Sequence, residues 1–205
     1  SKFNFQEMVF EHFRKKSSDI KKDISDIHEK ISFDNNTLHD VRDIKVPIHD
    51  LKMNYFDVKL DQRNKFVIYF YKIDKIFNSN SSKSTGGQFY DIYLDLLKYL
   101  QKTFFKEKII VQSKPTLRVH IPNNISVGSY HRDRDYGHPE EEINIWLPLN
   151  KSNNTSALWL ESEPNKHDFK PYNLDYGEIL IFNSNLTHGT EINKEDHSRL
   201  SMDFR

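Results

Sequence analysis

The chain has 205 residues, of which 36% are hydrophobic and 29% are charged. Thirty basic residues balance thirty acidic ones, which disfavours a strongly basic nucleic-acid binder and an acidic tail protein. Cysteine is absent, which excludes disulfide scaffolds, thiolate zinc sites, iron–sulfur clusters and cysteine nucleophiles. No apolar run reaches the ~18–20 residues of a membrane span, and no secretory signal is visible. We therefore expect a cytoplasmic protein without a membrane or nucleic-acid partner.

The first part of the chain is predicted to be largely helical. Residues 3–31 show an amphipathic pattern, in which Ile20, Ile24, Ile27 and Ile31 form one apolar stripe. The pattern over residues 32–64 is mixed and favours no single structure. The aromatic run 65–71 is typical of a strand, and the stretch 78–87 is rich in Asn, Ser and Gly and is typical of a loop. Residues 89–106 form a second predicted helix.

The second half of the chain predicts short strands separated by turns. The predicted strands are 109–112, 116–121, 143–149, 158–161, 178–183 and 199–205. Many short strands without helices between them favour an antiparallel sandwich or barrel, and a jelly roll is the leading candidate. We expect an α+β fold made of one domain, 1–205. Residues 89–205 would be a jelly-roll (double-stranded β-helix) core, and residues 1–88 a helical extension packed on its sheet.

A candidate metal site comes from two histidines and one aspartate. His131 and Asp133 lie two positions apart, and in an extended segment such residues point to the same side. His188 follows the strand predicted at 178–183, and Gly189 beside it permits a close backbone approach. Two histidines and one carboxylate leave half an octahedron open, as in non-haem Fe(II) oxygenases. Alone, an H-x-D pair is more often a surface histidine beside a solvated aspartate.

The last predicted strand places an arginine and a serine on one face. Residues 199–205 alternate strictly, so Leu200, Met202 and Phe204 share one side, while Arg199 and Ser201 share the other. A guanidinium and a hydroxyl two positions apart form a fork that suits a carboxylate. An ordinary amphipathic edge strand would show the same alternation.

The order of these residues resembles that of the Fe(II)/2-oxoglutarate-dependent oxygenases. Residues 89–205 are similar to the small phytanoyl-CoA-dioxygenase-like group, whose nearest members accompany streptomycin biosynthesis and bacterial surface-carbohydrate gene clusters. The stretches that carry this resemblance are TLRVHIP (116–122), HRD (131–133), YGHP (136–139), EINIWLPL (142–149), LWLES (158–162) and LSMDFR (200–205).

The resemblance implies a role for each of these residues. His131, Asp133 and His188 would be the iron ligands and the catalytic residues. Arg199 would bind the distal carboxylate of the co-substrate 2-oxoglutarate, with Ser201 assisting, and dioxygen would take the last iron position. An aspartate at position 133, rather than Ala or Gly, favours hydroxylation over halogenation. Asn144 is a weaker candidate for co-substrate binding.

Four further residues are candidates for contact with the substrate. Arg118 and His120 share one strand face, which would be either the barrel interior or a solvent-exposed surface. Tyr136 and His138 would line the mouth of the site, although His138 is equally well explained as a loop residue beside Pro139. The resemblance suggests a sugar, a nucleotide sugar or a glycan precursor as the small-molecule substrate, and nothing in the sequence specifies an oligomeric state.

Two other functions fit the same pattern. The protein would be either a silent jelly-roll protein that binds a small molecule such as a sugar, or a cupin-like metal enzyme that does not use 2-oxoglutarate. The pair formed by Arg199 and Ser201 favours the oxygenase over the cupin-like enzyme, because only the oxygenase requires a carboxylate anchor there. Fold alone does not decide between the three functions, because jelly rolls support many activities.

Overall fold

The chain forms two helices and eight short strands over the residues that the computed structural model describes, which are 3–14, 25, 69–71, 87–105, 107–112, 115–123 and 130–205. Helix α1 spans Phe5–Arg14 and helix α7 spans Gly87–Phe104. Two short 3-10 turns are η1 (Asp133–Tyr136) and η2 (Asn154–Ser156). The strands are β1 (Tyr69–Tyr71), β2 (Thr116–His120), β3 (Ile143–Pro148), β4 (Leu158–Leu160), β5 (Lys170–Tyr172), β6 (Leu180–Asn183), β7 (His188–Gly189) and β8 (Arg199–Phe204).

The strands form two antiparallel sheets with the order of a jelly roll. One sheet runs β1-β2-β8-β3-β6 and the other runs β5-β4-β7. An isolated antiparallel bridge between His131 and His188 adds a fourth segment to the smaller sheet, beside β7. From β2 onward the chain therefore passes back and forth between the two sheets, except that β4 and β5 pair with each other within the smaller sheet, and this is the strand order of a double-stranded β-helix. The predicted jelly roll is confirmed.

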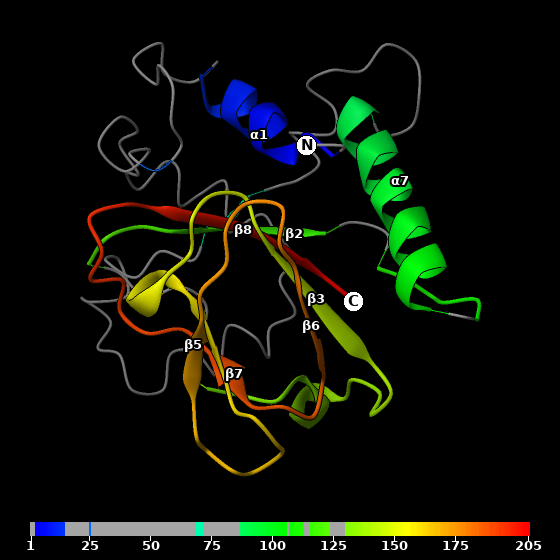
Figure 1. Ribbon diagram of the computed structural model, residues 1–205, viewed down its shortest axis with the longest axis vertical. Helices are drawn as coiled ribbons and strands as arrows, with labels where there is room; N and C mark the ends of the chain where they lie inside the picture. The colour runs from blue at the N-terminus through cyan, green and yellow to red at the C-terminus, as the bar shows by residue number, and fades with distance from the viewer. Residues whose placement is uncertain are drawn as a thin grey trace.

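The main core lies between the larger sheet and the helices (Figure 1). Along β2, β3 and β8, every second side chain faces α1 and α7, because strand residues alternate between the two sides of a sheet. Tyr93 of α7 meets Phe204 of β8 edge to face, with ring centroids 5.2 Å apart. The buried strand residues of this core are Leu117, Val119, Ile145, Leu147, Leu200, Met202 and Phe204.

A smaller apolar cluster lies between the two sheets. Trp146 of β3 and Phe182 of β6 come from the larger sheet, and Leu158 and Leu160 of β4 come from the smaller one. The alternation along β8 leaves Arg199 and Ser201 on this inner side, and both are buried. The fold therefore places a charged and a hydroxyl group inside the barrel, on the same side as this apolar cluster.

Most predicted elements agree with the structure within the described residues. The predicted helix 89–106 corresponds to α7, and five predicted strands correspond to β2, β3, β4, β6 and β8. Helix α1 covers the start of the predicted helix 3–31, and β1 covers the end of the predicted strand 65–71. The described part of the chain has no helix that is long and apolar enough to cross a membrane. The rest of the helix prediction, the mixed stretch 32–64 and the loop 78–86 lie outside the described residues.

One predicted strand is absent, and two short strands were not predicted. Residues 109–112 form no strand; Ile110 is fully exposed, and a single backbone bond from Gln112 N to Arg205 O (2.6 Å) joins this segment to β8. Strands β5 and β7 were missed, because two or three residues are too few to show alternation. Strand β8 is not an edge strand, because β2 and β3 flank it, and this position explains why both of its faces are buried.

Candidate metal centre

The structure brings His131, Asp133 and His188 together. One ligand atom from each residue lies within 4.8 Å of the other two, and the three could hold a metal ion. His131 Nε2 lies 3.5 Å from Asp133 Oδ1, and His188 Nε2 lies 3.9 Å from Asp133 Oδ2. Two backbone hydrogen bonds of 2.9 Å, exchanged between His131 and His188, fix the two histidines side by side. These two histidines are 57 positions apart in the sequence, so the approach depends on the fold.

The local backbone differs from the extended segment that was predicted around Asp133. Arg132 is extended, with φ −107° and ψ 133°, but Asp133 is the first residue of the turn η1. The two side chains still converge, because the extended residue between them keeps both on one side. Asp133 is almost completely buried, at 3% exposure, whereas His131 is half-buried.

Hydrogen bonding and burial prepare His188 to bind a cation. Its Nδ1 lies 3.0 Å from the carbonyl oxygen of Leu186, so Nδ1–H donates there and Nε2 keeps its lone pair. The ring also meets Phe182 edge to face at 4.9 Å. Burial, together with the neighbouring His131, lowers the pKa of His188 to about 4. The imidazole is therefore neutral near pH 7, as a metal ligand must be.

Two side chains hold the carboxylate of Asp133. Asn144 Nδ2 donates to Oδ2 at 2.7 Å, and Arg205 Nη2 lies 3.3 Å from Oδ1. Arg205 Nε also donates to Asn144 Oδ1 at 3.2 Å, so the two side chains support each other. Burial raises the pKa of Asp133, but the hydrogen bond from His131 and the charges of His188 and Arg205 outweigh it and hold the pKa well below its usual range.

The network continues from Asp133 toward the surface. Arg205 Nε lies 3.2 Å from Glu142 Oε1, and His138 Nδ1 lies 2.9 Å from the same oxygen. Tyr136 meets His131 edge to face at 5.6 Å. Tyr136 and His138 therefore lie beside the candidate metal centre, although their predicted contact with a substrate stays a prediction.

Arg199 is a buried cation that has no anionic partner among the described residues. It is 1% exposed, and no carboxylate in the described part of the chain lies within 4 Å of its guanidinium. Nε donates to Ser156 O at 3.0 Å, Nη1 donates to Ser201 Oγ at 2.6 Å, and Nη2 lies 3.3 Å from His120 Nδ1. Burial, assisted by the charge of Arg118, lowers the pKa of Arg199 to about 9. An unpaired buried charge is costly, so this site favours an anionic ligand.

Arg118 and His120 lie on β2, which pairs directly with β8, and their side chains are on the inner side of the barrel. The register pairs Arg118 with Ser201 and His120 with Arg199. The guanidinium of Arg118 is bound to both carboxylate oxygens of Asp203, and His120 is 1% exposed. Of the two predicted locations for this face, the barrel interior is confirmed. A direct contact of either side chain with a substrate stays a prediction.

Sequence reasoning gave no role to three buried or half-buried groups near the centre. Arg205 shares a face with Arg199, but its contact with Asp133 depends on the fold. Thr190 lies two positions after His188, and its buried Oγ1 has no hydrogen-bond partner among the described residues. Burial raises the pKa of Glu161, but hydrogen bonds from Thr187 and from the backbone of His167 and Asn165 outweigh it and lower the pKa to about 2. Only the spacing of Thr190 from His188 could have marked one of the three in advance.

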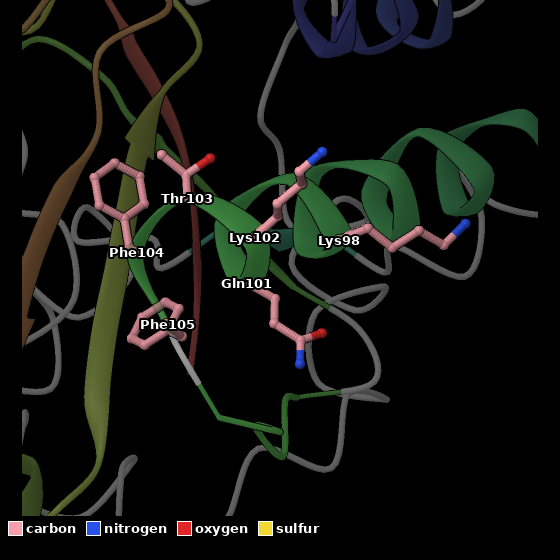
Figure 2. A pocket seen from close by; sticks show the side chains of 6 residues that line it. All are labelled: Lys98, Gln101, Lys102, Thr103, Phe104 and Phe105. Atoms are coloured by element: carbon pink, nitrogen blue, oxygen red, sulfur yellow. The ribbon is translucent and has the colours of Figure 1, made fainter.

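A separate surface hollow lies at the carboxyl end of α7. It has a volume of about 550 Å³ and contains none of the residues discussed above (Figure 2). Two lysines and two phenylalanines contribute to its wall, and Phe104 is half exposed. Its residues are Lys98, Gln101, Lys102, Thr103, Phe104 and Phe105. This hollow is therefore not part of the candidate metal centre.

Gly189 lets the two histidine segments approach each other. A Cβ atom at this position would lie 3.1 Å from the Cα and from two ring atoms of Tyr130, next to His131. Gly189→Ala is expected to force the segments apart and to lower the free energy of unfolding by about 1–3 kcal/mol. Denaturant unfolding followed by circular dichroism measures this loss. Gly177→Ala is a control for crowding, because a Cβ there meets no atom within 4 Å and only its positive φ of 102° is strained. An unchanged free energy of unfolding in Gly189→Ala would contradict the crowding at Gly189.

The chain resembles a protein of known biosynthetic context. No family model matches it. The streptomycin biosynthesis protein StrG of Streptomyces griseus is 34% identical over 142 residues, which cover 64% of this chain and 67% of StrG. The chain belongs to the StrG family. This relationship confirms the resemblance to the group associated with streptomycin biosynthesis.

Solved structures similar to this member of the StrG family include EvdMO1, AviO1 and a prolyl-4-hydroxylase. EvdMO1 matches with a TM-score of 0.45 and 17% identity over 60% of this chain and 33% of its own. AviO1 from Streptomyces viridochromogenes matches with a TM-score of 0.45 and 14% identity over 60% and 62%. A Pseudomonas putida prolyl-4-hydroxylase matches with a TM-score of 0.42 and 15% identity over 60% and 67%. This chain thus spans about a third of EvdMO1.

Proposed function

We propose that the chain is a non-haem Fe(II)/2-oxoglutarate-dependent dioxygenase that hydroxylates an unactivated C–H bond of a small molecule. The observation that carries the proposal is the combination of two groups inside one barrel. One is the cluster of His131, Asp133 and His188, and the other is the buried guanidinium of Arg199, which has no anionic partner among the described residues. A metal ion would bind to the cluster, and the carboxylate of a co-substrate would pair with the guanidinium of Arg199.

The donor set fits ferrous iron. Two imidazole nitrogens and one carboxylate oxygen are the ligands of the facial triad, which leaves positions open for further ligands. When bound with 2-oxoglutarate and dioxygen, the iron would supply an oxidation in which one oxygen atom enters the substrate as a hydroxyl group and the other enters succinate, with release of CO2. Asp133 would fill the carboxylate position, so we expect hydroxylation rather than halogenation.

The side chains of the barrel would position the co-substrate. Arg199 would bind the distal carboxylate of 2-oxoglutarate, and its hydrogen bonds to Ser156 and Ser201 already fix the plane of the guanidinium. Thr190 offers a buried hydroxyl without a partner in the described part of the chain. Trp146, whose ring centre lies 5.6 Å from Arg199 Cζ, would help to exclude water from the ion pair.

Asn144 would orient the carboxylate of the proposed metal ligand Asp133. Its amide donates to Asp133 Oδ2 and accepts from Arg205 Nε, so both ends of the amide are occupied. Outer-shell partners of this kind orient a ligating carboxylate and tune its metal affinity. The proposed role of Asn144 is therefore to hold Asp133, and its contact with the co-substrate stays a prediction.

We propose a sugar, a nucleotide sugar or a glycan precursor as the substrate. The relative StrG is named for streptomycin biosynthesis, which supports a substrate of sugar type. Arg118, His120, Tyr136 and His138 stay the candidates for substrate contact. A cupin-like enzyme without 2-oxoglutarate is the second candidate, because the metal cluster alone would serve it equally well.

The test is the formation of succinate from 2-oxoglutarate in the presence of Fe(II), ascorbate and air. We expect the wild-type chain to form succinate, and faster when the true sugar substrate is added. His131→Ala should abolish this turnover, because it removes one of three ligands. His197→Ala is the matched control, since the side chain of His197 pairs with Asp196 and, among the described residues, forms no hydrogen bond or ion pair with the three proposed ligands. Undiminished turnover in His131→Ala would overturn the assignment, and metal binding without 2-oxoglutarate turnover would favour the cupin-like enzyme.

A further inference from the structure

Glu161 is a buried carboxylate that the proposed reaction does not use. It follows β4 and is 0% exposed, and no cation in the described part of the chain lies within 4 Å of it. Its oxygens accept hydrogen bonds from the backbone instead, from Thr187 N at 2.6 Å and from His167 N at 3.1 Å. Burying a carboxylate that has no cation within 4 Å costs free energy, which hydrogen bonds must offset. At Glu161 these hydrogen bonds come from two separate segments of the chain.

The first bond joins Glu161 to the segment that carries His188. Thr187 directly precedes His188. Three hydrogen bonds join Glu161 and Thr187: Thr187 N donates to the Glu161 carboxylate, Glu161 N donates to Thr187 O at 3.1 Å, and the Thr187 side chain also bonds to the carboxylate. His188 in turn exchanges both backbone bonds with His131. A shift of Thr187 away from Glu161 would therefore move His188 relative to His131.

The second bond joins Glu161 to the loop 162–169. His167 and Asn165 have φ values of 56° and 64°, a left-handed conformation that needs local support in residues other than glycine. Backbone N–H groups in such a turn form a concave anion site, which the carboxylate of Glu161 fills. Asn165 Oδ1 then accepts a hydrogen bond from Arg132 Nη1 at 2.9 Å. Arg132 lies between His131 and Asp133 in the sequence.

One carboxylate thus reaches both halves of the metal centre. We propose that Glu161 is a positioning residue that fixes the distance between His188 and the pair His131 and Asp133. It acts through Thr187 on one side, and through Asn165 and Arg132 on the other. This inference rests on the proposed function, because it assumes that the three residues bind a metal ion.

The variant Glu161→Gln tests this role. The glutamine keeps the shape of the side chain, but its NH2 group must face one of the two backbone N–H groups, and two donors repel each other. We expect the affinity for Co(II), measured by calorimetry, to fall by about 10- to 100-fold, as it does for other outer-shell partners. We also expect the visible absorption spectrum of the Co(II) complex to change, which a loss of stability alone would not cause.

Asp168→Asn is the matched control in the same loop. Asp168 accepts hydrogen bonds from Ser162 N at 2.9 Å and from Ser162 Oγ at 2.8 Å, but these bonds close the loop only onto itself. The Co(II) affinity and spectrum of Asp168→Asn should equal those of the wild type. A folded Glu161→Gln variant with wild-type Co(II) affinity and spectrum would overturn the role of Glu161.

A third variant decides the case if Glu161→Gln does not fold. Asn165→Gly keeps the left-handed backbone and removes only the contact with Arg132. A fall of about threefold or more in Co(II) affinity supports the proposal, and an unchanged affinity overturns it. If the wild-type chain itself binds no Co(II), the proposed function is wrong. If the wild type binds Co(II) and the variants bind it with the same affinity, only the role of Glu161 is wrong.

Discussion

Asp133→Asn is expected to lower the affinity for Fe(II) or Co(II) by more than about 100-fold, because loss of an outer-shell partner alone costs about 10- to 100-fold. The amide removes the one negative charge among the three ligands. It also presents an NH2 group either to the donor Nδ2 of Asn144 or to the guanidinium of Arg205. Anaerobic calorimetry of metal binding measures the loss, and succinate formation from 2-oxoglutarate should disappear with it.

Asp95→Asn is the control for this variant. Asp95 lies on the exposed side of α7 and pairs with Lys98 at 3.1 Å. Its loss should leave the metal affinity within about threefold of the wild type, because an exposed pair contributes at most about 1 kcal/mol. If Asp133→Asn bound metal as the wild type does, or if both variants lost affinity equally, Asp133 would not be a ligand.

Arg199→Met is expected to have two opposite effects. Without ligand, it removes a buried charge that has no anionic partner among the described residues, so the free energy of unfolding should stay constant or rise by up to about 1–4 kcal/mol. The lost hydrogen bonds to Ser156 O and Ser201 Oγ limit this gain. With 2-oxoglutarate, the variant loses the carboxylate anchor. Truncating one partner of a buried pair costs about 2–5 kcal/mol, so the affinity should fall by about 30-fold or more.

Thermal unfolding with and without 2-oxoglutarate separates the two effects. The wild type loaded with Co(II) should gain stability from 2-oxoglutarate, whereas Arg199→Met should gain almost none. Arg134→Met is the control, because Arg134 is an exposed cation that pairs with Glu140 and lies away from Arg199 in the sequence. A 2-oxoglutarate shift that persists in Arg199→Met would show that the co-substrate binds elsewhere, and would remove the main support for the oxygenase.

Local patterns predicted the parts of this protein that depend only on near neighbours in the sequence. The alternation of Leu200, Met202 and Phe204 placed Arg199 and Ser201 on the opposite face of β8, because strand geometry fixes that relation. Local spacing also predicted the helix over 89–106, which corresponds to α7. Likewise, a spacing of two was enough to bring His131 and Asp133 to one side.

The sequence by itself determined which residue types were available and which of them share a strand face, since these follow from backbone periodicity. Only the tertiary structure decided their partners. Arg118 lies on β2, Arg199 on β8, and Arg205 directly after β8. Arg118 pairs with Asp203 and Arg205 with Asp133, whereas Arg199 pairs with no carboxylate among the described residues. The pairing of Arg118 with Asp203 depends on the register between β2 and β8, which are about 80 residues apart. The pairing of Arg205 with Asp133 depends on the position of the turn η1 beside the end of β8. Registers of that kind are fixed by long-range burial, which no local pattern encodes.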